Sequence, residues 1–136
     1  MKIEFPLLVL GYSQKRVFSI ETDEGHVLFP IFYDAEKAEA FRIFFGREHK
    51  QKLEAFVIAD AQVALPFFRH LLIADPGLQG VVLDPPPPVD GKEGGHTIPY
   101  LQFLEQLRGQ FRKHMYRRRN RHKMVGNHRP TRTKKV

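Results

Sequence analysis

The sequence contains no cysteine and no tryptophan, and serine occurs only at positions 13 and 19. Without thiolates the protein can form no disulfide, no cysteine-ligated zinc site and no iron–sulfur cluster, and it has no cysteine nucleophile. The scarcity of serine and the lack of a Gly-x-Ser-x-Gly sequence argue against a serine nucleophile. The seven histidines show no His-x-x-x-His or His-Glu-x-x-His spacing. We therefore expect neither a metal nor another cofactor.

Long apolar runs are also missing. Near the N-terminus an apolar run of about five residues ends at Gly11, which is shorter than the apolar region of a secretory signal. No stretch approaches the roughly 18–20 apolar residues that span a bilayer. We therefore expect a cytoplasmic protein that does not insert into a membrane.

Acidic residues are absent after Glu105, whereas residues 108–136 contain twelve Lys or Arg. Residues 1–107 contain ten Lys or Arg and fifteen acidic residues, a net charge of −5. The overall charge of +7 therefore hides a strong asymmetry. The sequence predicts an acidic domain that carries a basic C-terminal arm.

The apolar residues that are present, 42% of the chain with twelve Phe, suffice for the core of one domain. Runs rich in β-forming residues predict strands over residues 3–11, 16–21, 26–33, 52–58 and 80–83. Helical spacing of apolar residues predicts one helix that Asp34 caps and that stops at Gly46. Asp60 is a candidate cap for a second helical stretch, but because Pro66 lacks an N–H donor we expect a short turn and then a helix from near Pro66 to residue 75. A third helix opens at residues 97–99.

The predicted order β-β-β-α-β-α-β-α indicates an α+β fold, in which helices pack on a small mixed sheet. The apolar stripe of the last helix weakens after Phe111. We therefore predict one domain over residues 1–111 and a basic tail over residues 112–136. The tail is expected to be partly helical and then disordered from Met124 onward.

Two segments resemble a known family. Residues 28–41 read LFPIFYDAEKAEAF and residues 80–85 read GVVLDP. They resemble a strand-to-helix signature and a later strand of the SseB (enhanced serine sensitivity) N-terminal-domain family. The resemblance covers roughly residues 17–85 and implies a small α/β domain. It carries over no catalytic residue.

The basic arm holds the candidate functional residues. Arginine can bind phosphate with two hydrogen bonds and stack on bases, and a tyrosine ring can stack as well. Cations four residues apart repel in an isolated helix, so a bound polyanion would stabilise this one. We expect the arm to contact RNA, ribosomal RNA in particular, through Arg112, Lys113, Tyr116, Arg117, Arg118, Arg119, Arg121 and Lys123.

Other interpretations of the arm stay open. It could dock an acidic protein, which would make the chain a protein–protein adaptor, or it could lie on an anionic membrane surface. A third hypothesis is an enzyme with an unrecognised site near the Pro- and Gly-rich loop of residues 84–96. The sequence favours a non-enzymatic interaction module whose arm binds RNA or another polyanion.

Overall fold

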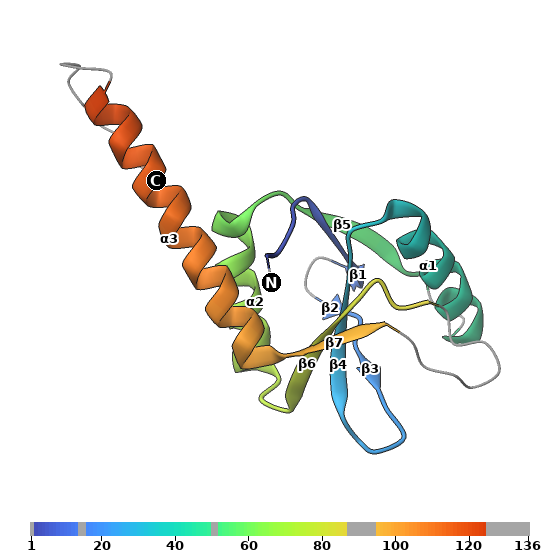
Figure 1. Ribbon diagram of the computed structural model, residues 1–136. Coiled ribbons are helices and arrows are strands. Elements are labelled where there is room, and N and C mark those ends of the chain that lie inside the picture. The colour runs from blue at the N-terminus through green and yellow to red at the C-terminus, as the bar shows by residue number, and fades with distance from the viewer. Residues whose placement is uncertain (1, 14–15, 50–51, 87–94, 125–136) are drawn as a thin grey trace.

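The computed structural model of the protein describes residues 2–13, 16–49, 52–86 and 95–124, with the main chain alone at Ser13, His49, His114 and residues 117–124 (Figure 1). The described strands are β1 (Leu7–Ser13), β2 (Arg16–Val17), β3 (Ile20–Glu21), β4 (Val27–Phe32), β5 (Glu54–Ile58), β6 (Leu78–Leu83) and β7 (His96–Pro99). The helices are α1 (Ala35–His49), α2 (Ala61–Ala74) and α3 (Tyr100–Met124).

The strands form one mixed sheet, which confirms the predicted α+β fold. Its main order is β2-β1-β4-β6-β7, and β5 and β3 pair with β1 and β4. Strands β4 and β6 are parallel, and the other pairs are antiparallel. The carboxyl ends of β4 and β6 therefore lie side by side.

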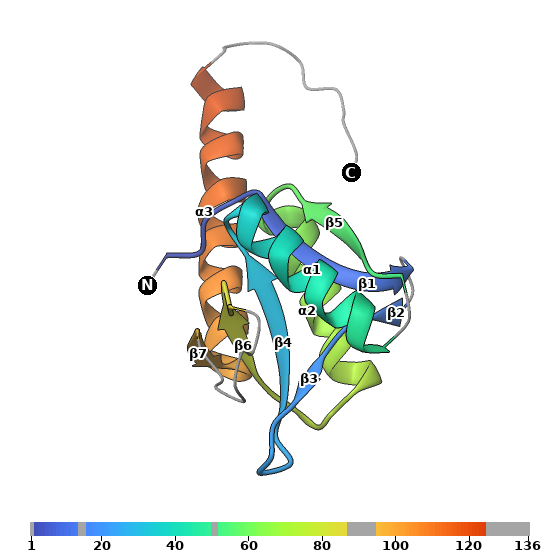
Figure 2. The same cartoon turned by 90° about the vertical axis from the view of Figure 1, so that its right-hand side faces the viewer.

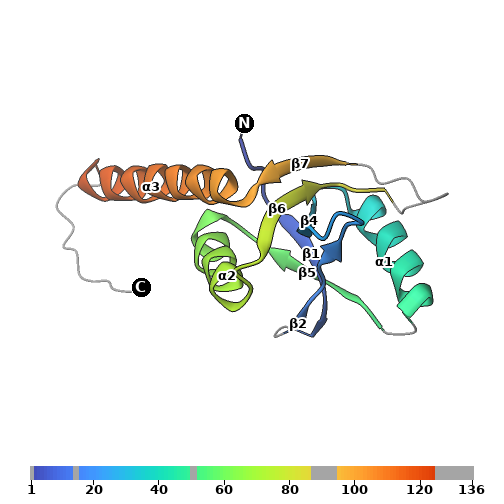
Figure 3. The ribbon, with the colours of Figure 1, turned by 90° about the horizontal axis from the view of Figure 1, so that it is seen from below.

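Helices cover both faces of the sheet. Figure 3 shows α1 on one side of the strands, with α2 and α3 on the other. Side chains alternate along β1, because successive residues of a strand point to opposite faces. Leu7 and Val9 join the cluster under α2 and α3, and Leu10 joins the cluster under α1.

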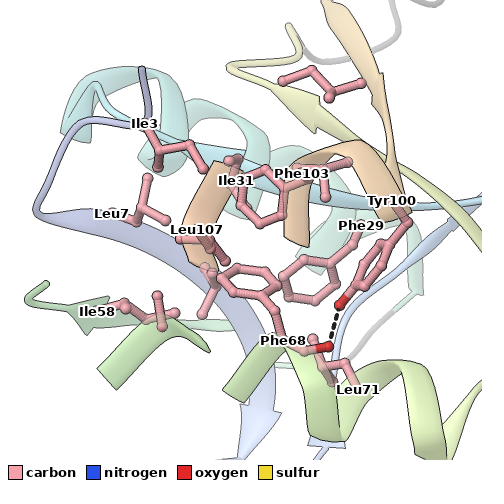
Figure 4. Close-up of a cluster of buried hydrophobic side chains, with 14 of the residues drawn as sticks. Ile3, Leu7, Phe29, Ile31, Ile58, Phe68, Leu71, Tyr100, Phe103 and Leu107 are labelled. Carbon is pink, nitrogen blue, oxygen red and sulfur yellow. Dashed lines mark hydrogen bonds between the residues drawn. The ribbon is translucent and has the colours of Figure 1, made fainter. Parts of the chain in front are cut away.

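The larger apolar cluster lies between the sheet and the α2–α3 pair, as Figure 4 shows. Phe68 of α2 is at its centre, with ring centroids 5.7 Å from Phe29 of β4 and 4.9 Å from Phe103 of α3. Edge-on contacts of this kind add to the free energy gained by burial alone. The smaller cluster joins Phe41 of α1 to Phe18 and Phe32.

The start of α2 differs from the prediction. The helix begins at Ala61, because the Asp60 carboxylate accepts a hydrogen bond from the N–H of Val63 at 3.0 Å and caps it. Pro66 lies inside the helix and not at its start. Proline has no N–H, so the main-chain carbonyl four residues before Pro66 receives no helical hydrogen bond. Because Pro66 is exposed, this carbonyl is on the side of the helix that faces water.

Four other predicted boundaries are wrong. The first strand, predicted over residues 3–11, is Leu7–Ser13. Helix α1 continues past Gly46 to His49, since one helical glycine costs only about 1 kcal/mol and Phe45 still packs on the smaller cluster. Residues 97–99 belong to strand β7 and not to the last helix, because Ile98 is buried opposite Val81 of β6. The predicted strand over residues 16–21 is divided: β2 pairs with β1, and β3 pairs with β4.

Asp84 ties the carboxyl ends of the two parallel strands together. It follows β6 with a left-handed φ of 43°, which is rare outside glycine. One of its carboxylate oxygens accepts hydrogen bonds from the N–H groups of Tyr33 at 2.9 Å and Asp34 at 3.3 Å. Its own N–H donates to Ile31 at 2.8 Å. Asp34 in turn caps α1, as predicted, by accepting from the N–H of Glu36 at 2.8 Å.

We predict that Asp84→Ala lowers the free energy of unfolding by about 2–3 kcal/mol, because two N–H groups lose their acceptor and alanine tolerates a left-handed φ poorly. Asp84→Asn keeps a side-chain oxygen and tolerates that φ, so we expect a loss below about 1 kcal/mol. Urea unfolding of both variants measures the difference. Equal losses would contradict the assigned hydrogen bonds.

Candidate nucleic-acid interface

The first turns of α3 anchor the helix to the domain. Tyr100, Phe103 and Leu107 are fully buried against α2 and the sheet. The Tyr100 hydroxyl donates a hydrogen bond to the carbonyl of Phe68 at 2.7 Å (Figure 4). Burial raises the pKa of this phenol well above its ordinary value. The base of α3 is therefore rigidly attached.

A second attachment of α3 lies one turn after Leu107, at Gln110. The Gln110 carboxamide accepts a hydrogen bond from the N–H of Ile3 at 2.8 Å and donates one to the Ile3 carbonyl at 2.9 Å. Gln106 donates to the same Gln110 oxygen at 2.9 Å. This pairing joins segments 107 residues apart. It holds α3 to the N-terminal segment close to Phe111, which packs against the larger apolar cluster.

Beyond Phe111, α3 leaves the domain. Figure 1 shows this half projecting from the body, and Figure 2, turned by 90°, shows it rising past the other elements. The main chain stays helical to Met124. At 1.5 Å per residue, the part from Arg112 to Met124 is about 20 Å long. We call residues 112–124 the arm.

The structure brings the predicted site residues together on this one helix. Arg112 and Lys113 are exposed, and Tyr116 is 64% exposed. The other predicted residues share the same helical main chain, but their side chains lie outside the described part: Arg117, Arg118, Arg119, Arg121 and Lys123. The predicted disordered end, residues 125–136, also lies outside it, and the predicted domain boundary falls within α3.

The ion pairs of the described residues join near neighbours in the sequence. Within the described parts, Glu39 pairs with Arg42, Glu54 with Lys52 and Glu105 with Arg108. Arg112 and Lys113 form no ion pair with any described residue. Their positive charges are therefore available to an external anion.

A cavity of about 430 Å³ lies on the α1 side of the sheet, beside the loop that the enzyme hypothesis singled out. It is within the size range of ligand pockets. Glu21 is the one ionisable side chain in its described lining, whose members are Ile20, Glu21, Thr22, Leu28, Phe41, Phe45, Val82, Pro85, Pro86, Gly95 and Thr97. A lone carboxylate gives no acid–base pair. The sequence pointed to the loop, but it did not indicate the rest of the lining, which comes from well-separated segments.

The described residues contain no cluster of three His, Cys, Asp or Glu that could hold a metal ion. In the same part of the chain, no helix combines the length and apolarity needed to cross a bilayer. Neither a protein-family model nor a curated protein matches this sequence. The resemblance to the SseB N-terminal-domain family therefore stays a prediction.

The Tyr100 anchor predicts a pH-dependent stability. The folded phenol has a raised pKa, so the unfolded chain loses this proton first as the pH rises above about 10, and wild-type stability falls there. Tyr100→Phe lacks this proton and also one hydrogen bond worth about 0.5–1.5 kcal/mol. In urea unfolding, wild type should exceed the variant at pH 8, and the gap should shrink above pH 10. A gap that stays constant to pH 11 would refute the assignment.

Proposed function

We propose that the protein is a non-enzymatic interaction module in which an SseB-like α/β domain presents a basic helical arm to RNA. One observation carries the proposal: the arm projects from the domain, and its described cations, Arg112 and Lys113, have no acidic partner there. A helical arm packed into the domain with its guanidinium groups paired internally would have argued for a structural role instead.

The chemistry of the arm suits phosphate. Each cation that contacts a phosphate releases a condensed counterion, and this entropy gain drives sequence-independent binding. Arginine provides most of the charge and can hold phosphate with two hydrogen bonds, and the exposed ring of Tyr116 offers a surface for one base. The proposed partner is cytoplasmic RNA, with ribosomal RNA foremost.

The proposal predicts that a chain ending at Phe111 keeps its fold and loses RNA binding. The buried part of α3 and the Gln110–Ile3 pairing remain in this shorter chain, so its thermal unfolding should stay cooperative. RNA binding by fluorescence anisotropy should be lost. If six or more cations contact phosphate, the affinity of the full chain should fall by about 10³-fold or more between about 50 and 200 mM salt.

Two results would reject this function. The first is equal RNA binding by the full and the shortened chain, because it would move the site to the domain. The second is capture of an acidic protein that survives nuclease treatment and needs the arm, because it would favour the adaptor interpretation. Absorbance at 260 nm of the purified full chain, before and after a high-salt wash, gives an early indication.

A further inference from the structure

The basic residues of the arm occupy main-chain positions on more than one side of α3. An α-helix turns by about 100° per residue, so positions seven and eleven residues apart return to nearly the same side. Arg112, Arg119 and Lys123 have these spacings and define the first side of the arm. Arg121 is nine residues after Arg112, about two and a half turns, and so has the opposite position. Arg117 and Arg118 flank it and complete the second side.

A partner with a flat surface would contact the basic residues on only one side of the arm. A membrane surface or the face of an acidic protein touches one side of a helix, and cations on the far side would stay in water and contribute little. A single strand of nucleic acid is held mainly by several stacked aromatic rings along a basic groove. The arm has one tyrosine, Tyr116, and no phenylalanine or tryptophan. Its charges fit an environment with phosphates on more than one side.

We propose that the arm enters the major groove of folded RNA at a point where a bulge or an internal loop widens the groove. This inference rests on the proposed function and names its target. A helix with side chains is about 10–12 Å wide, whereas the major groove of regular A-form RNA is deep and narrow. The arm therefore discriminates against an uninterrupted RNA duplex.

Depth favours RNA over DNA. The major groove of B-DNA admits a helix but is only about 8.5 Å deep, so the outer side of a bound helix faces water. The widened groove of RNA is deeper, and its two walls place phosphates beside more of the helix circumference. Cations on both the first and the second side of the arm are therefore neutralised only in the RNA groove.

The domain supplies what this mode of binding needs. Helix α3 is continuous from its buried residues Tyr100, Phe103 and Leu107 into the arm, so the arm has a helical support before RNA binds. Extending an existing helix avoids the cost of nucleating a new one. The attachment of Gln110 to Ile3 fixes the direction in which the arm leaves the domain.

The test compares two triple variants of the full chain that remove equal charge from opposite sides. The first is Arg112→Gln, Arg119→Gln and Lys123→Gln, and the second is Arg117→Gln, Arg118→Gln and Arg121→Gln. Glutamine favours helices about as well as lysine and arginine do. Circular dichroism should therefore show equal helicity, and thermal unfolding should match that of wild type. The probes are an RNA hairpin with a purine-rich internal loop, an uninterrupted RNA hairpin, single-stranded RNA and a DNA duplex, all with equal numbers of phosphates.

We expect wild type to bind the looped hairpin about tenfold more tightly than the other three probes. Both triple variants should weaken this binding about tenfold or more, to a similar extent. One variant that loses binding while the other stays within about twofold of wild type would show one-sided contact and overturn the inference. Equal wild-type affinity for all four probes, or tighter binding to DNA, would do the same. Absence of wild-type binding to any RNA at about 0.1 M salt would instead reject the proposed function.

Discussion

The position of α3 against the N-terminal segment depends on the pairing of the Gln110 carboxamide with the main chain of Ile3. The side-chain amide accepts from the N–H and donates to the carbonyl of the same residue, as a neighbouring strand would. It thus satisfies main-chain groups at the start of the chain and fixes α3 at the point where its apolar stripe ends. A helix as rich in like charges as the arm has little stability alone. Its helicity is propagated from a segment that apolar burial and this amide hold in place.

The domain and the arm differ in the charges that they carry and in what those charges contact. Several carboxylates of the domain bind nearby groups. Asp34 and Asp60 cap helices, and Asp84 joins the parallel strands. Glu105 pairs with Arg108 one turn away. These contacts use acidic groups where main-chain N–H groups or nearby cations need them. Within the described part of the chain, neither Arg112 nor Lys113 forms an ion pair with a carboxylate. The separation seen in the composition is therefore also a separation in space.

Much of this fold could be predicted from the sequence, because local signals and burial agree over most elements. The segment from β4 into α1 shows this best: apolar strand residues lead to Asp34, whose carboxylate caps the helix as expected. Prediction failed where a distant partner decides the structure. Ile98 lies in a strand because it pairs with β6. The segment that starts at Arg16 pairs first with β1 and then with β4. The candidate interface residues are chosen mainly from charge, and their role stays a prediction. Their projection from the domain could not be predicted, since it depends on Gln110 meeting Ile3, 107 residues away.

Under the proposed function, the length of the arm reconciles an acidic domain with a polyanionic partner. Residues 1–107 carry a net charge of −5, which would repel RNA phosphates at close range. The screening length is about 8 Å at physiological salt, whereas the arm extends about 20 Å from the domain. Phosphates around the outer turns of the arm are therefore largely screened from the acidic surface, while those near Arg112 are not. In the proposed complex, this gradient would favour contact through the outer turns of the arm and keep the acidic domain outside the groove.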